Sequence, residues 1–141
     1  MKKTLGAVVA LAAAASWGAT YALVEQAMEQ MSPTAAIIVI YFAGSLLMLP
    51  VVPFYLDEIS SCLKSASLSP LILTVLLTVV AELLIFSSIK MLGGTEAGII
   101  EITYPIFTAL ILYVTLGKSL TASTLIGGAL ALIGIAVMTI F

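Results

Sequence analysis

The sequence contains no histidine and no arginine, and its only cysteine is Cys62. Without histidine the chain has no His-based catalytic triad and no histidine-ligated metal site, and a single cysteine closes no intrachain disulfide. Five lysines stand against seven acidic residues, which gives a net charge of -2 and no basic face for nucleic acid. No activated nucleophile is apparent either. We therefore predict no nucleic-acid partner, no metal, no cofactor and no enzymatic activity.

Charged residues of any kind are scarce. They make up 9% of the 141 residues, whereas 62% are hydrophobic and the mean hydropathy is +1.28. A water-soluble domain of this size could not bury so much apolar surface. A bilayer-spanning helix needs about 20 mostly apolar residues, and the chain offers five such runs. We predict an all-α membrane protein with five transmembrane helices in one domain, residues 1–141, surrounded by the lipid bilayer.

Serine and proline mark the ends of the first runs. Ser32-Pro33 and Ser69-Pro70 are typical of helix starts, with serine as N-cap and proline in the first turn. Pro50 and Pro53 should end or bend the second run. A polar loop, "YLDEISSCLKSASLSP", is predicted to follow it.

Glycine and threonine mark the later ends. Gly93-Gly94 predicts a tight turn, Gly117 a C-terminal cap, and Thr95 and Thr121 the N-caps of the last two runs. The predicted spans cover about residues 5–24, 33–53, 70–90, 96–116 and 121–141.

The N-terminal stretch allows a second interpretation. "MKKTLGAVVALAAAAS" has the basic start, apolar middle and small residues of a cleavable signal peptide, and cleavage would leave four spans. Against this, the apolar run continues through Trp17, Tyr21 and Val24, which makes it long enough to span a bilayer.

Three stretches, "SWGATYALVEQ", "MSPTAAIIVIYFAGSLLMLP" and "YPIFTALILYVTLGKSLTASTLIGGALALIGIAVM", together resemble one EamA-type repeat of the drug/metabolite transporter superfamily. The similarity covers nearly the whole chain. Trp17-Gly18 matches a Trp-Gly pair of the first span and Pro105 a proline within the fourth. The link "GKSLT" matches a Gly-acid, Leu-Thr pattern, except that Lys118 replaces the usual glutamate. A basic residue often found in the second span is absent, with Tyr41 near its place.

The resemblance implies a small-molecule transporter of the cell (inner) membrane, most simply an exporter of a small metabolite or organic cation that works by alternating access. In that family the midplane cavity is usually formed by two repeats in ten spans. The resemblance therefore implies a homodimer, or a heterodimer with a second five-helix repeat. The alternative is a non-transporting membrane subunit or assembly partner.

The last run carries a candidate packing seam. "GGALALIG" places Gly127, Ala131 and Gly134 on one helix face, where small side chains let backbones approach closely. The spacing is similar to the last-helix dimerisation motif of the small multidrug resistance proteins, a four-span branch of the same superfamily. The alternative is packing within one chain, because small residues are common in membrane helices.

Lysine placement predicts the orientation. With five spans, Lys2, Lys3, Lys64 and Lys118 lie on one side of the membrane and only Lys90 on the other, which predicts a cytoplasmic N-terminus and an external C-terminus. This bias favours one fixed orientation, so an inverted pair would need an oppositely oriented partner. Insertion in both orientations stays open.

Two glutamates fall inside the runs. An ionisable side chain in a bilayer costs several kcal/mol unless it faces a protein interior or a wet cavity, so Glu82 and Glu101 need partners or a function. Thr78 precedes Glu82 by one helical step, and Tyr104 and Thr108 share the face of Glu101. Three other glutamates lie at span ends and are expected to be solvated: Glu25, Glu29 and Glu96.

The two glutamates differ in depth, and Glu82 is the deeper. At the helical rise they are about 17 Å and 11 Å from the shared turn, and a difference of about 6 Å does not forbid coupling, directly or through water. Two nearby carboxylates repel, so one of them can hold a proton, which suits proton-coupled exchange and a cationic substrate. In the alternative, Glu82 pairs with Lys90 or bonds to Thr78, and Glu101 reaches the headgroups.

Aromatic residues complete the candidate cavity. Trp17 and Tyr21 share a face of the first span and, with Tyr41, could hold a cationic solute; the alternative is ordinary packing or interfacial anchoring. Pro105 lacks an amide donor and crowds the carbonyl of Glu101, which predicts a hinge. The predicted substrate or proton site comprises Trp17, Tyr21, Tyr41, Thr78, Glu82, Glu101, Tyr104 and Thr108.

Overall fold

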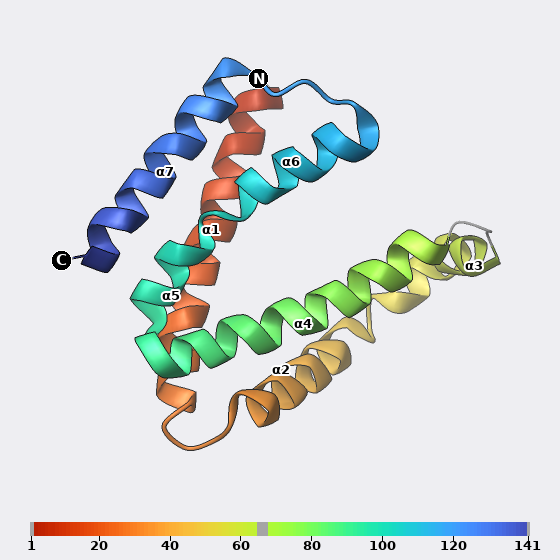
Figure 1. Ribbon diagram of the computed structural model, residues 1–141. Helices are drawn as coiled ribbons and strands as arrows, with labels where there is room; N and C mark the ends of the chain where they lie inside the picture. Colours follow the sequence, from red (N-terminus) through yellow and green to blue (C-terminus); the bar gives the residue numbers. More distant parts are fainter. Residues whose placement is uncertain (1, 65–67, 141) are drawn as a thin grey trace.

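The computed structural model describes residues 2–64 and 68–140, and within them every regular element is a helix (Figure 1). The elements are α1 (Lys2–Ala27), α2 (Pro33–Met48), the 3-10 helix η1 (Val52–Tyr55), α3 (Leu56–Lys64), α4 (Leu68–Leu92), α5 (Gly94–Glu101), α6 (Tyr104–Leu116) and α7 (Ala122–Ile140). The predicted all-α class is confirmed.

The helices form an open frame. α4 packs against α1, α2 and α5, α5 also packs against α1, and α6 packs against α7. In Figure 1, α2 and α4 run side by side while α1 crosses them at a steep angle, and α7 stands apart from α2 and α3. The helices therefore meet closely near the α4–α5 turn and diverge away from it.

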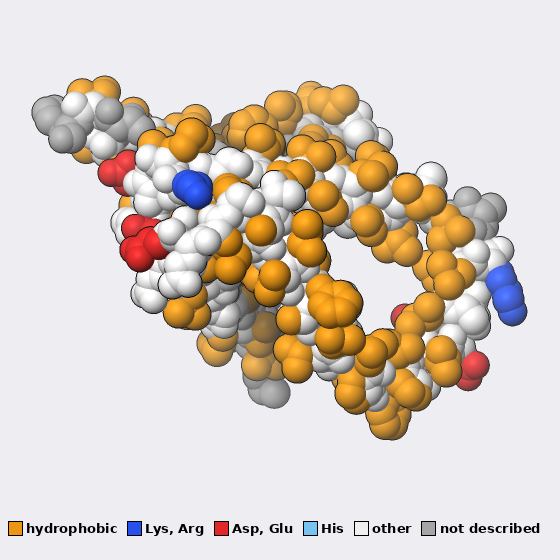
Figure 2. Space-filling model, turned by 90° about the horizontal axis from the view of Figure 1, so that it is seen from below, with side chains coloured by type: hydrophobic (Ala, Val, Ile, Leu, Met, Phe, Trp, Pro, Cys, Tyr) orange, Lys and Arg blue, Asp and Glu red, His pale blue; other side chains and the backbone are white. Residues whose placement is uncertain are grey.

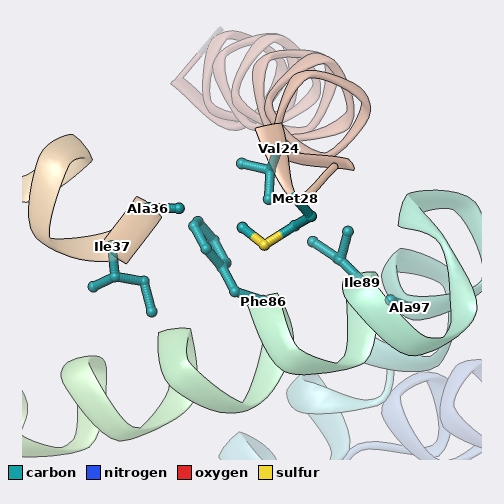
Figure 3. Close-up of a cluster of buried hydrophobic side chains, with 7 residues drawn as sticks. All are labelled: Val24, Met28, Ala36, Ile37, Phe86, Ile89 and Ala97. Carbon is teal, nitrogen blue, oxygen red and sulfur yellow. The ribbon is translucent and has the colours of Figure 1, made fainter. Parts of the chain in front are cut away.

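A small apolar core holds this meeting point together. Its buried side chains come from the C-terminal end of α1 and the residue after it, the N-terminal end of α2, the last turns of α4 and the start of α5 (Figure 3). Phe86 lies between the α1 and α2 side chains in that view. The members are Val24, Met28, Ala36, Ile37, Phe86, Ile89 and Ala97.

Most of the apolar surface stays uncovered. The accessible surface is 10898 Å², whereas a compact water-soluble monomer of 14.7 kDa would have about 6,900 Å². Figure 2 shows one face, on which orange apolar side chains fill the middle and most charged side chains lie toward the two ends. Such a surface is suited to lipid or to another membrane protein rather than to water.

Three helical stretches are long and apolar enough to cross a bilayer: Thr4–Ala27, Leu68–Leu92 and Gly94–Leu116. The first of these continues past the alanines, as expected from Trp17 and Tyr21. A fourth span results if α2 and the η1–α3 segment count as one, although they are bent by 73°. The apolar part of α7, Ala122–Met138, is shorter than the other candidates. Five spans stay a prediction.

The predicted polar loop, residues 55–70, is wrong over residues 55–64 and 68–70, because the chain turns at Pro50 and Pro53 and then resumes a helix. The proline bend itself is confirmed. α3 carries Asp57, Glu58 and Lys64, and an Asp or Lys side chain costs about 2.5 to 3.5 kcal/mol at the bilayer centre, which disfavours α3 as the second half of a span.

Several predicted helix ends are confirmed. Ser32 caps α2 by accepting a hydrogen bond from the Ala35 amide at 3.2 Å, and Thr121 likewise accepts from the Thr124 amide at 3.2 Å. Gly117 ends α6 with a φ of 61°, in the left-handed region that favours glycine.

Two predicted caps are wrong. Thr95 lies inside α5, because Gly93 adopts a φ of 87° and the helix begins at Gly94. Ser69 lies inside α4, which already contains Leu68; the three residues before Leu68 fall outside the described ranges.

Candidate functional site

A cavity of about 770 Å³ lies where α1 faces α4, α5 and the start of α6. Its walls include Trp17 and Tyr21 from α1, Glu82 from α4, Glu101 from α5 and Tyr104 from α6. The structure thus brings together five of the eight residues that were expected to form the site. Their sequence signal was polarity or aromaticity at helical spacing within apolar runs.

The wall between α1 and α5 depends on two glycines one helical step apart. A Cβ atom on Gly94 would lie 2.9 Å from the Tyr21 carbonyl oxygen, and one on Gly98 would lie 2.9 Å from Cδ2 of the Tyr21 ring. Real side chains do not approach so closely, so only glycine allows α1 to pack here. This close contact places Tyr21 against the face of α5 that carries Glu101.

Two hydrogen bonds join the same pair of helices. The Tyr21 hydroxyl donates to Oε2 of Glu101, and the Gly94 amide donates to Oε2 of Glu25 at 2.7 Å. The second bond also places a carboxylate at the N-terminus of α5, where the helix dipole favours negative charge. Both carboxylates therefore have a fixed partner on the opposite wall.

Glu25 is the site residue that the sequence analysis missed, because its place at a span end suggested simple solvation. It lines the cavity together with Trp17 and Tyr21. A signal was present, since the three residues follow each other at four-residue steps and so share one face of α1.

Glu82 is different from the other two carboxylates. It is half-buried and lines the cavity, but among the described residues no side chain or backbone group donates a hydrogen bond to it. Lys90, its expected ion-pair partner, instead donates from Nζ to the Met31 carbonyl oxygen at 3.2 Å. No described hydrogen bond joins Thr78 to Glu82 either, so neither structural alternative for this glutamate is observed.

Three expected residues lie outside the cavity lining. Thr78 is exposed, and the Thr108 hydroxyl donates to the Tyr104 carbonyl oxygen of its own helix at 3.1 Å. Tyr41 on α2 does not line the cavity either. The expected polar stripes therefore reach the cavity only in part.

The fourth predicted span breaks beside Glu101. α5 ends at Glu101 and α6 begins at Tyr104, with Pro105 in the first turn of α6. Thr103 bridges the break, because its hydroxyl and its amide both donate to the Ile100 carbonyl oxygen, at 2.9 Å and 3.2 Å. Irregular backbone of this kind is tolerated at membrane depth where it lines a cavity or is buried in protein.

The chemistry of the walls is acidic and aromatic. Three carboxylates line the cavity, and no lysine occurs among its described lining residues. The Trp17 and Tyr21 rings lie 5.9 Å apart between centroids, tilted by 55°. Carboxylates and aromatic faces both attract cations, so the arrangement suits a positively charged solute.

The two glycines of the predicted seam on α7, Gly127 and Gly134, do not pack against other helices of the chain. A Cβ atom on Gly127 or Gly134 would meet nothing within 4 Å, whereas one on Gly128 would lie 3.2 Å from Cγ1 of Ile106. Ala131 is half-buried. α7 thus contacts α6 through Gly128, whereas Gly127 and Gly134 have free space beside them.

No curated protein and no solved structure gives a significant match. The model of the EamA-like transporter family matches residues 4–140, which is nearly the whole chain. Together with the apolar helices and the acidic cavity, this match shows that the chain belongs to the EamA-like transporter family, a family of membrane transporters of the drug/metabolite type.

Proposed function

We propose that the protein exports a small organic cation or cationic metabolite across the cell (inner) membrane, with proton coupling through Glu82. The observation that carries this proposal is the contrast among the three cavity carboxylates. Glu25 and Glu101 each accept a hydrogen bond from the opposite wall, whereas Glu82 faces the same cavity without a described partner. Glu82 can therefore exchange a proton for a cation without breaking a contact within the protein.

Glu101 has a different role in this proposal. Its hydrogen bond to Tyr21 connects α1 to the last residue of α5, immediately before the break at residues 102–103. Pro105 supplies no amide to the break, so the join between α5 and α6 lacks one helical hydrogen bond. We propose that this join is the hinge at which the cavity opens, and that the Tyr21–Glu101 bond holds one of its positions.

Pairing with a second five-helix repeat is part of the proposal. The accessible surface exceeds that of a compact monomer by about 4,000 Å², and obligate interfaces bury about 2,000 to 5,000 Å². The open glycines of α7 supply a surface where a second helix can approach closely. A second copy or an oppositely oriented partner would thus cover the cavity, with the N-terminus of this chain cytoplasmic and its C-terminus external.

The proposal is tested with a Glu82→Gln substitution. Purified protein in phosphatidylcholine vesicles is given a pH gradient, and uptake of tetraphenylphosphonium and a panel of small amines is followed by filtration. Glutamine keeps the size of the side chain but neither ionises nor takes up a proton, so gradient-driven uptake should disappear. A Glu29→Gln variant is the matched control, because Glu29 is exposed and outside the cavity lining.

Each outcome decides between functions. Equal uptake by the Glu82→Gln variant and the native protein would rule out the coupling role of Glu82. A native protein that transports none of the panel, alone or with a five-helix partner, would instead favour the non-transporting subunit, which needs only the α7 surface.

A further inference from the structure

The η1–α3 segment leaves the axis of α2 abruptly. Residues Val52–Lys64 are bent by 73° from the Pro33–Met48 helix, and in Figure 1 α3 lies at the right-hand edge, beyond the end of α2. If α2 stands along the membrane normal, a segment of this length and angle changes depth by only about 6 Å. The headgroup zone on each side of a bilayer is about as thick, so the whole segment fits within it.

The two sides of α3 differ in chemistry. At 100° per residue its apolar side chains occupy one continuous arc and its charged side chains the opposite one. The apolar arc is exposed rather than packed on the protein, with Leu56 at 54% and Leu63 at 59% exposure. The apolar arc comprises Leu56, Ile59, Cys62 and Leu63, and the polar arc comprises Asp57, Glu58, Ser60, Ser61 and Lys64.

The surroundings of the segment also suit the edge of a bilayer. Phe54, 84% exposed, and Tyr55 stand at the bend. Tyrosine is enriched at the membrane–water boundary, and phenylalanine is common on the apolar face of interfacial helices. A second hollow, of about 470 Å³, lies between the end of α2 and the apolar arc of α3. Its lining is apolar apart from Glu58 and the Tyr55 hydroxyl, and comprises Met48, Val51, Val52, Tyr55, Glu58, Ile59 and Cys62.

We propose that η1–α3 is an interfacial helix whose apolar arc and adjoining hollow take up lipid acyl chains while its polar arc faces the headgroups and water. The surface continues that of α2, so the occupant is the same bilayer. Two acids against one lysine give the segment no attraction to anionic headgroups. It therefore binds through apolar burial and prefers no acidic lipid.

Cys62 makes the proposal testable in the full chain, because it is the sole cysteine, is exposed and belongs to the apolar arc. A fluorophore is attached to it, and the protein is reconstituted in phosphatidylcholine vesicles. Quenching is measured with brominated lipid and with aqueous iodide on both sides of the membrane. The matched control carries Cys62→Ser and Ser61→Cys, which moves the label by one residue to the polar arc.

The expected ratio of lipid quenching to iodide quenching is at least about fivefold higher for Cys62 than for the control. It should change less than about twofold when a third of the lipid is made anionic. A second label at Leu63→Cys, on the Cys62→Ser background, should behave like Cys62. This result does not depend on transport, so it stands or fails separately from the proposed function.

Two results would overturn the proposal. Strong iodide quenching at both Cys62 and Ser61→Cys would place the segment in water. Protection of Cys62 from iodide and from brominated lipid alike would show that a protein surface, and not the bilayer, covers the apolar arc.

Discussion

Replacing Gly94 with alanine should loosen the contact between α1 and α5. The added Cβ would lie 2.9 Å from the Tyr21 carbonyl oxygen and 3.0 Å from Oε2 of Glu25. The backbone oxygen cannot move without shifting α1, and a shift would lengthen the 2.7 Å bond between the Gly94 amide and Glu25. Overpacking of this kind costs typically about 1 to 3 kcal/mol, and alanine's better helix propensity returns at most about 1 kcal/mol.

The matched control is Gly44→Ala, because Gly44 is also within a helix but its added Cβ would meet nothing within 4 Å. We expect Gly44→Ala to be neutral or slightly stabilising, and Gly94→Ala to fall about 1 to 3 kcal/mol below it in free energy of unfolding. The measurement is reversible unfolding in mixed micelles with increasing SDS, followed by circular dichroism. Equal transition midpoints for the two variants would refute the close packing of α1 on α5.

Three further predictions address the core, the cavity and the topology. Phe86→Ala should lower the free energy of unfolding by about 3 to 5 kcal/mol, because this ring is only 3% exposed. The same SDS titration measures the loss. A loss smaller than that of the exposed Phe107→Ala would contradict the burial of Phe86 in the core. Tyr21→Phe removes the donor to Glu101 and should cost about 1 to 2 kcal/mol in that titration, whereas an unchanged midpoint would show that the bond contributes nothing. A reporter fused after Phe141 should be active only on the external side; equal activity on both sides would contradict the orientation proposed from the lysines.

The fold class and most of the cavity wall could be predicted because both depend on where polar residues interrupt long apolar runs. Glu82 and Glu101 are conspicuous in apolar runs, and the cost of burying a charge in lipid directs them to one interior. Trp17 and Tyr21 followed from helical spacing alone. The break at residues 102–103 was anticipated from Pro105, whose missing amide is a local property.

What could not be predicted depends on contacts between distant segments. The role of Gly94 and Gly98 depends on the position of Tyr21, which faces them. The local sequence "GTEAG" does not predict which residue of another helix packs against it. Glu25 has the sequence pattern of a solvated residue, because its partner, the amide of Gly94, lies 69 residues along the chain. The α3 helix was missed because the polar residues of "YLDEISSCLKSASLSP" favour a loop. Its apolar and polar residues nevertheless recur at a helical period, which places them on opposite sides of α3.

The position of the small core also has a consequence for biosynthesis. All seven of its residues lie between Val24 and Ala97, so none comes from α6 or α7. Membrane helices insert first and associate afterwards, and this core is complete in sequence once α5 has left the ribosome. We expect α1, α2, α4 and α5 to assemble while α6 and α7 are still being synthesised, so that the last two helices dock on an already folded unit.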